Sequence, residues 1–206
     1  MESHPEFEQV AEELGEKVVD GFAEAVRQTR ADLADYRLEH PRWVADHGER
    51  GLANWLHDRL WAHTREIFDA IPGTVLHEVG PTREVLVKSR YRVRIKRHHM
   101  DGAVSNYLTA SALAFFEEPV VQFTLDGLGE VRLIAGYEWD REVRKMGRAV
   151  LSLRDGQHNV IWLEELPEPE DGSVMPITAP SSSAGPTKPT VIVEDEDGTV
   201  EERGQG

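Results

Sequence analysis

Residues 83–96 read REVLVKSRYRVRIK, and this stretch indicates the fold class because apolar residues occupy every second position through most of it. A period of two is typical of a β-strand, whose successive side chains point to opposite faces of a sheet. We therefore predict one strand over residues 83–96, with an apolar face and a cationic face. The apolar face holds Val85, Val87, Tyr91, Val93 and Ile95. The cationic face holds Lys88, Arg90, Arg92, Arg94 and Lys96.

Upstream of this strand, apolar residues recur at steps of three and four, which is the period of an amphipathic helix. From Phe7 to Tyr36 this pattern predicts one long helix. A second helix is expected over about Gly51–Ala70, with the stop signal Pro72-Gly73 after it. Residues 1–72 are thus predicted to be helical.

Downstream, the period of two returns in three further stretches. Strands are predicted over Val131–Trp139, about Arg148–Leu153, and Asn159–Leu163. The pair Asp155-Gly156 favours a tight hairpin between the last two, and therefore antiparallel neighbours. Residues 106–118 fit either a short helix or a buried loop.

These elements predict an α+β protein in which an N-terminal helical pair packs on the apolar face of an antiparallel sheet. One domain is expected over residues 1–166, with 73–166 mainly β, because this length sustains a hydrophobic core. After Leu166 the composition changes, since six of the eleven prolines lie between positions 167 and 189. Residues 167–206 are therefore predicted to be a disordered acidic tail.

The predicted tail contains a short segment suited to binding a partner. An apolar triplet is followed directly by acidic residues, a pattern that can add as a strand to the edge of a sheet. The segment consists of Val191, Ile192, Val193, Glu194 and Asp195.

Charge is distributed in blocks along the chain, whose formal net charge is −15. Residues 1–82 have a net charge of −9, residues 83–154 of +4, and residues 155–206 of −10. This acidity disfavours nonspecific contact with nucleic acid or anionic lipid, but it leaves a positive island in the middle of the chain. No Cys is present, and no apolar run reaches the about 18 residues that span a bilayer. We therefore expect a cytoplasmic protein that does not engage a membrane.

The cationic face is the candidate anion-binding site, and Arg97 extends it by one residue. Like charges about 6.6 Å apart repel one another, so the row needs solvent, carboxylates or an anionic partner. A solvated sheet face and an anion-binding face both meet this requirement. Under the second interpretation the partner is nucleic acid or an acidic protein segment, and the acidic tail is an internal competitor.

No catalytic signature is present, so the sequence favours a protein without enzymatic activity and without a cofactor. His98, His99 and Asp101 form the densest set of metal-ligating residue types. Adjacent ligands on a strand point to opposite sides, so no metal site is expected there.

Two alternative functions remain open at this point. A metal-dependent nuclease could use the carboxylates of Glu138, Asp140 and Glu142, whose spacing places them on one face of an extended segment. An acidic nucleic-acid mimic or antitoxin could instead use the two negative blocks to occupy the basic site of a DNA-binding partner.

Three stretches, RVRIKRHHMDG, RLIAGYEWD and RAVLSLRDGQHNVIWLEEL, resemble a group of uncharacterised actinobacterial proteins over roughly residues 85–166. Proteins of this group are encoded near helix-turn-helix regulators and metallopeptidases of the ImmA/IrrE type, in mobile or phage-defence regions. The resemblance implies a regulatory partner, such as a helix-turn-helix regulator, and it transfers no catalytic residue. We therefore predict a non-catalytic regulatory or interaction protein, whose long first helix could also pair two copies in a homodimer.

Overall fold

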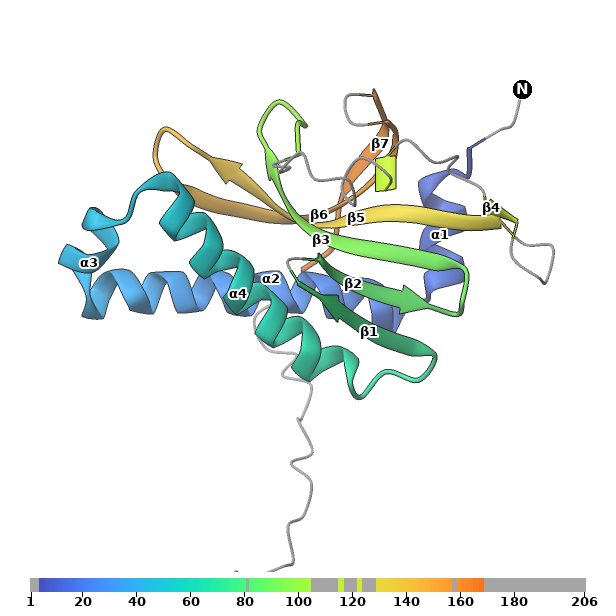
Figure 1. Cartoon of the computed structure of the whole chain (residues 1–206), viewed down its shortest axis with the longest axis horizontal. Coiled ribbons are helices and arrows are strands. Elements are labelled where there is room, and N and C mark those ends of the chain that lie inside the picture. Colours follow the sequence, from blue (N-terminus) through green and yellow to red (C-terminus); the bar gives the residue numbers. More distant parts are fainter. Residues whose placement is uncertain are drawn as a thin grey trace, which may run out of the picture. The chain divides into compact units, whose positions relative to one another are not determined.

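The computed structural model describes residues 4–80, 82–104, 115–116, 122–123, 129–156 and 159–168. These residues form the predicted α+β fold, with N-terminal helices packed on a mostly antiparallel sheet (Figure 1). The tail segment from Val191 to Asp195 lies outside the described residues. So does most of the stretch 106–118, in which only Phe115 and Phe116 are described, as helical.

Four helices are described before the sheet: α1 (Phe7–Leu14), α2 (Glu16–Glu39), α3 (Pro41–Asp46) and α4 (Glu49–Phe68). The predicted single first helix is interrupted at Gly15, whose φ of 90° lies in the region that favours glycine. The long helices α2 and α4 pack against each other. None of the helices in the described part of the chain is long and apolar enough to span a membrane.

Six strands form the sheet in the order β1-β2-β3-β5-β6-β7, and the short β4 pairs with β5. The strands are β1 (Thr74–Val79), β2 (Thr82–Val87), β3 (Tyr91–His99), β4 (Gln122–Phe123), β5 (Gly129–Asp140), β6 (Lys145–Asp155) and β7 (Asn159–Glu165). Helix α2 contacts β5 and β6, while α4 contacts β1 and β3. The predicted hairpin at Asp155-Gly156 is confirmed by the antiparallel pairing of β6 with β7.

The predicted continuous strand over residues 83–96 is wrong, because the chain turns in its middle. Lys88 and Ser89 have φ values of 50° and 55°, and this left-handed pair reverses the chain so that β2 and β3 become antiparallel neighbours. Val87 lies opposite Tyr91, so both residues point to the same face and the period of two continues through the turn. No Gly, Asn or Asp marks this turn in the sequence.

Strands β3 and β5 run parallel, which corrects the prediction of an antiparallel sheet at this one pair. Parallel neighbours need a long crossover connection, here residues 100–128. Gly136 of β5 approaches β3 so closely that a Cβ atom at this position would lie 1.7 Å from the carbonyl oxygen of Lys96. Only glycine therefore fits at this point of the parallel pair.

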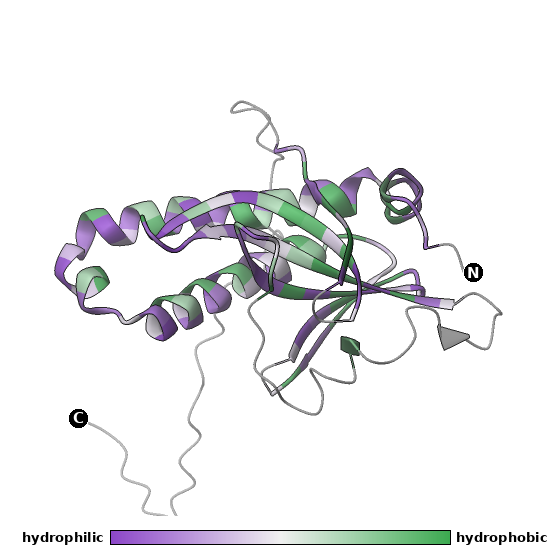
Figure 2. Ribbon diagram, turned by 90° about the horizontal axis from the view of Figure 1, so that it is seen from above, coloured by the Kyte–Doolittle hydropathy of each residue, from purple (hydrophilic) through white to green (hydrophobic). Residues whose placement is uncertain are grey.

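The hydrophobic core lies between the helices and one face of the sheet. All five residues of the predicted apolar face belong to it: Val85, Val87, Tyr91, Val93 and Ile95. In Figure 2, apolar and polar segments alternate along the helices, as expected for helices with one buried face. A smaller apolar cluster, on the other face of the sheet, joins Ile134 of β5 to Val104, Phe115 and Phe116.

Replacing Gly136 with alanine should destabilise the protein by about 3 kcal/mol or more. The added methyl group would overlap the backbone carbonyl of Lys96, and β3 and β5 would have to move apart to make room for it. Urea unfolding followed by circular dichroism measures this loss. Gly48→Ala is the matched control, since no atom lies within 4 Å of the added Cβ, and it should cost less than about 1 kcal/mol. Equal costs at the two positions would contradict the close approach of β5 to β3.

Candidate functional site

The side chains at the centre of the predicted cationic face are engaged within the molecule. Arg94, which is 6% exposed, donates from Nε and Nη2 to Oε1 of Glu84 at 2.9 and 2.6 Å. Arg92 donates to the other oxygen of Glu84 at 2.9 Å. Glu84 is 1% exposed and lies directly opposite Arg94 in the β2–β3 pair. The centre of this face is therefore a buried ion cluster.

The ion cluster extends onto β5. Glu130 accepts hydrogen bonds from Arg92 at 3.1 Å and from Arg132 at 3.0 Å. The guanidinium of Arg94 stacks over Phe115, with 3.9 Å between its Cζ and the ring centroid. Hydrogen bonding to Glu130 is the largest cause of the raised pKa of Arg92. These charges link β3 to β5, and the stacking of Arg94 links β3 to Phe115.

Two further cations lie in the turn before β3 and attach helix α1 to the sheet. Arg90 forms an ion pair with Glu13, and Lys88 donates to the backbone carbonyl of the same residue at 2.5 Å. The hydroxyl of Tyr91 also donates to the Glu13 carboxylate, at 2.6 Å. This hydrogen bond is the main cause of the lowered pKa of Glu13.

The last two predicted anion-binding residues lie in the second half of β3. Arg97 is 3.7 Å from a carboxylate oxygen of Glu49, and its Cζ lies 5.7 Å from the ring centroid of Trp139. Lys96 is partly buried, and desolvation, followed by repulsion from Arg94, lowers its pKa. All four arginines among the six predicted residues thus have carboxylate partners in the same chain.

The histidines and carboxylates singled out in the sequence lie on β3, on β5 and in the turns that follow these strands, and His98 is opposite Glu138 in the parallel pair. His98 is fully buried 3.0 Å from the hydroxyl of Ser152, and burial lowers its pKa to about 3, so the ring is neutral at pH 7. Asp140 accepts backbone hydrogen bonds from Glu142 and Val143 and so shapes the β5–β6 turn. Among the described residues, no group of three His, Asp or Glu side chains could hold a metal ion.

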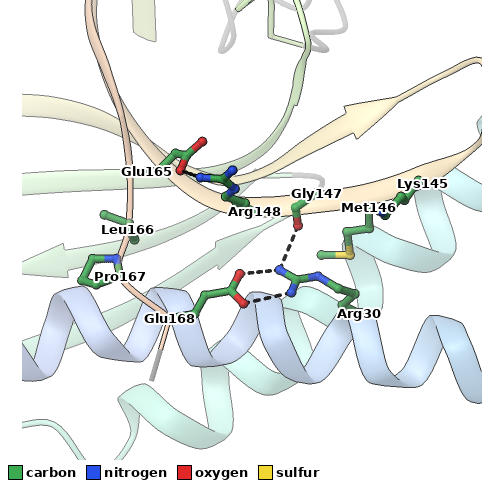
Figure 3. Close-up of a pocket in the computed structure, with 9 residues that line it drawn as sticks. All are labelled: Arg30, Lys145, Met146, Gly147, Arg148, Glu165, Leu166, Pro167 and Glu168. Atoms are coloured by element: carbon green, nitrogen blue, oxygen red, sulfur yellow. Dashed lines mark hydrogen bonds and ion pairs between the residues drawn. The ribbon is translucent and has the colours of Figure 1, made fainter. Parts of the chain in front are cut away.

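A different set of charges lines an open pocket of about 660 Å³ between α2, the start of β6 and the chain after β7 (Figure 3). Its charged residues are the cations Arg30, Lys145 and Arg148 and the carboxylates Glu165 and Glu168. Met146, Leu166 and Pro167 add apolar surface. The pocket therefore offers both charge and apolar contact within one hollow.

Arg30 and Glu168 point toward each other in this pocket (Figure 3). Arg30 donates from Nη1 to Oε2 at 2.9 Å and from Nη2 to Oε1 at 2.5 Å, so the guanidinium holds the carboxylate by two parallel hydrogen bonds. Its Nη2 also donates to the carbonyl of Gly147 at 2.8 Å. Bidentate pairing of this kind is selective for planar anions such as carboxylates.

The pKa of the Glu168 carboxylate is lowered by its surroundings. The hydrogen bonds from Arg30 are the largest cause of the lowered pKa of Glu168, and the Ala149 backbone acts in the same direction. The N–H of Leu166 donates to the Ala149 carbonyl at 2.9 Å, and Pro167 then ends this pairing because it has no N–H. Glu168 thus lies directly after the point at which the chain following β7 stops pairing with the backbone of β6.

The pocket is partly accessible to solvent. The side chains of Arg30 and Glu168 are 33% and 27% exposed, whereas those of Arg148 and Glu165, which also form an ion pair, are 68% and 45% exposed. The Nε of Arg30 is buried and has no hydrogen-bond partner within the described ranges. Arg30 therefore has donor capacity beyond what Glu168 and Gly147 use.

The sequence prediction missed this pocket. Arg30 and Glu168 are 138 positions apart, and they meet only because β7 pairs with β6 and directs the chain past α2. Glu168 also lies beyond residue 166, at which the predicted domain ends. The one local signal is the cluster of cations at 144–148, which reads RKMGR.

Comparison with protein-family models, with curated proteins and with solved structures finds no match to this chain.

Replacing Glu84 with glutamine should cost roughly 3–5 kcal/mol of stability, because Arg94 would remain buried without its carboxylate. Glu165→Gln removes the carboxylate from the exposed ion pair of Arg148 and Glu165, and this variant should cost less than about 1 kcal/mol. Urea unfolding of the two variants measures the difference. Similar losses of stability in both variants would mean that Arg94 is solvated, and they would contradict its buried pairing with Glu84.

Proposed function

We propose that this protein is a non-catalytic interaction protein that binds an acidic segment of a partner protein in the pocket around Arg30. The observation that supports this proposal is the bidentate hold of Arg30 on a carboxylate, in a pocket with two more cations, Lys145 and Arg148. An incoming Asp or Glu side chain offers the same planar pair of oxygens. Apolar neighbours of that acidic residue would contact Met146 and Pro167.

The geometry favours an acidic protein segment over nucleic acid. Nucleic-acid binding relies on several exposed cations that replace the counterions of successive phosphates. The arginines of β3 are paired with Glu13, Glu49, Glu84 and Glu130 instead. A compact pocket of three cations is suited to one or two carboxylates rather than to a phosphate backbone.

A regulatory role follows as part of the same proposal. A helix-turn-helix regulator, the partner implied by the sequence resemblance, would qualify if it presents an acidic segment. The acidic tail of this chain carries ligands of the same chemical class and is proposed to modulate binding by competition. A homodimer through the first helix is not required, because the apolar residues of α2 pack in the core of one chain.

Hexaglutamate labelled with a fluorophore tests the proposed site. It should bind the full chain in a salt-dependent manner, and Arg30→Gln should weaken binding roughly fivefold or more because it removes the bidentate donor. The double variant Lys145→Gln/Arg148→Gln, at exposed positions, should also weaken binding while leaving the fold intact. Fluorescence polarisation at 50 and 300 mM salt provides the measurement.

Arg59→Gln serves as the control, because Arg59 is a partly exposed arginine that pairs with Asp32 outside the pocket. Its affinity for hexaglutamate should match that of the unmodified chain. Absence of binding by all forms, or an equal loss in Arg30→Gln and Arg59→Gln, would disprove the site. Hexaglutamine, which has the same length without charge, should not bind.

A further inference from the structure

Glu168 occupies the position that a ligand carboxylate would take in the proposed function. It receives both hydrogen bonds of the Arg30 guanidinium. We infer that Glu168 is a built-in competitor, which keeps the pocket occupied until an acidic partner segment displaces it. This inference rests on the proposed function and adds its regulation.

The position of Glu168 in the chain gives it a high local concentration at Arg30. Leu166 is 3% exposed and anchored in the core, and only Pro167 separates it from Glu168. The fixed φ of proline further limits where the next residue can go. A carboxylate tethered so closely binds as an intramolecular ligand, so a free carboxylate must exceed a high effective concentration to replace it.

The contact is nevertheless placed to open without unfolding the domain. Both partners are about one-third exposed or slightly less, in contrast to the buried pair of Arg94 and Glu84. Exposed or half-exposed pairs contribute little to stability, because water replaces the lost hydrogen bonds. Release of Glu168 would leave Leu166 and its hydrogen bond to Ala149 in place.

Release would also leave the Arg30 guanidinium available to a second carboxylate. Arg30 would retain only the carbonyl of Gly147 among the acceptors described above, while its Nε is already buried without a partner. Lys145 lines the same hollow and adds positive potential, while Arg148 is paired there with Glu165. A carboxylate of the partner segment would therefore take the place of the Glu168 carboxylate at Arg30.

Two variants of the full chain separate this role from a merely structural one. Glu168→Gln keeps the shape but removes the charge, and Glu168→Ala removes the occupant. Both should bind hexaglutamate more tightly than the unmodified chain, by roughly tenfold for Glu168→Ala, because the fraction of open pocket rises. Glu39→Gln is the charge-matched control, at an exposed position near the end of α2, and its affinity should not change.

The outcomes distinguish the two proposals. Tighter binding by the Glu168 variants, abolished when Arg30→Gln is added, supports the competitor. Unchanged affinity in the Glu168 variants, with salt-dependent binding still lost in Arg30→Gln, would overturn the competitor and leave the site. No binding by any form, including Glu168→Ala, would overturn the site itself. An equal gain in Glu39→Gln would assign the effect to net charge and also overturn the competitor.

Discussion

The buried pairing of Glu84 with Arg92 and Arg94 is the interaction on which the sheet depends. It places a carboxylate of β2 between two guanidinium groups of β3, and Glu130 of β5 continues the alternation of charge. Removing the Glu84 carboxylate would take the charged partner from the buried Arg94, and breaking a buried ion pair in this way is costly. At its centre, the positive island of the sequence therefore contributes to the interior of the fold and to the pairing of β2, β3 and β5.

Periodicity was sufficient to predict the fold class and most elements, because a buried stripe on a helix and a buried face on a strand leave direct marks in the sequence. It was insufficient at residues 87–91, since a turn that returns Val87 opposite Tyr91 preserves the alternation. Without that turn, Glu84 and Arg94 cannot be recognised as partners, although they are directly opposite each other. The parallel pairing of β3 with β5 depends on a crossover whose path leaves no periodic signal.

The pocket illustrates a second limit of sequence reasoning. Arg30 and Glu168 each look like solvated charges, and only the path of the chain after β7 joins them. This pair is more exposed than the pair of Arg94 and Glu84, and we propose for this reason that its carboxylate can be exchanged. The ion pairs of this protein thus differ in their burial. The buried pair of Arg94 and Glu84 supports the fold, and the partly exposed pair of Arg30 and Glu168 is the one that we propose takes part in binding.

Side-chain ¹H–¹⁵N spectra of the arginines test this division most directly. In the Glu168→Ala chain, titration with hexaglutamate should shift the Nε–H signal of Arg30 in a saturable manner, while the signals of Arg92 and Arg94 stay in place. Shifts of the Arg92 and Arg94 signals with that of Arg30 unmoved would contradict the account, because they would show that the β3 cations, and not the pocket, receive the acidic ligand.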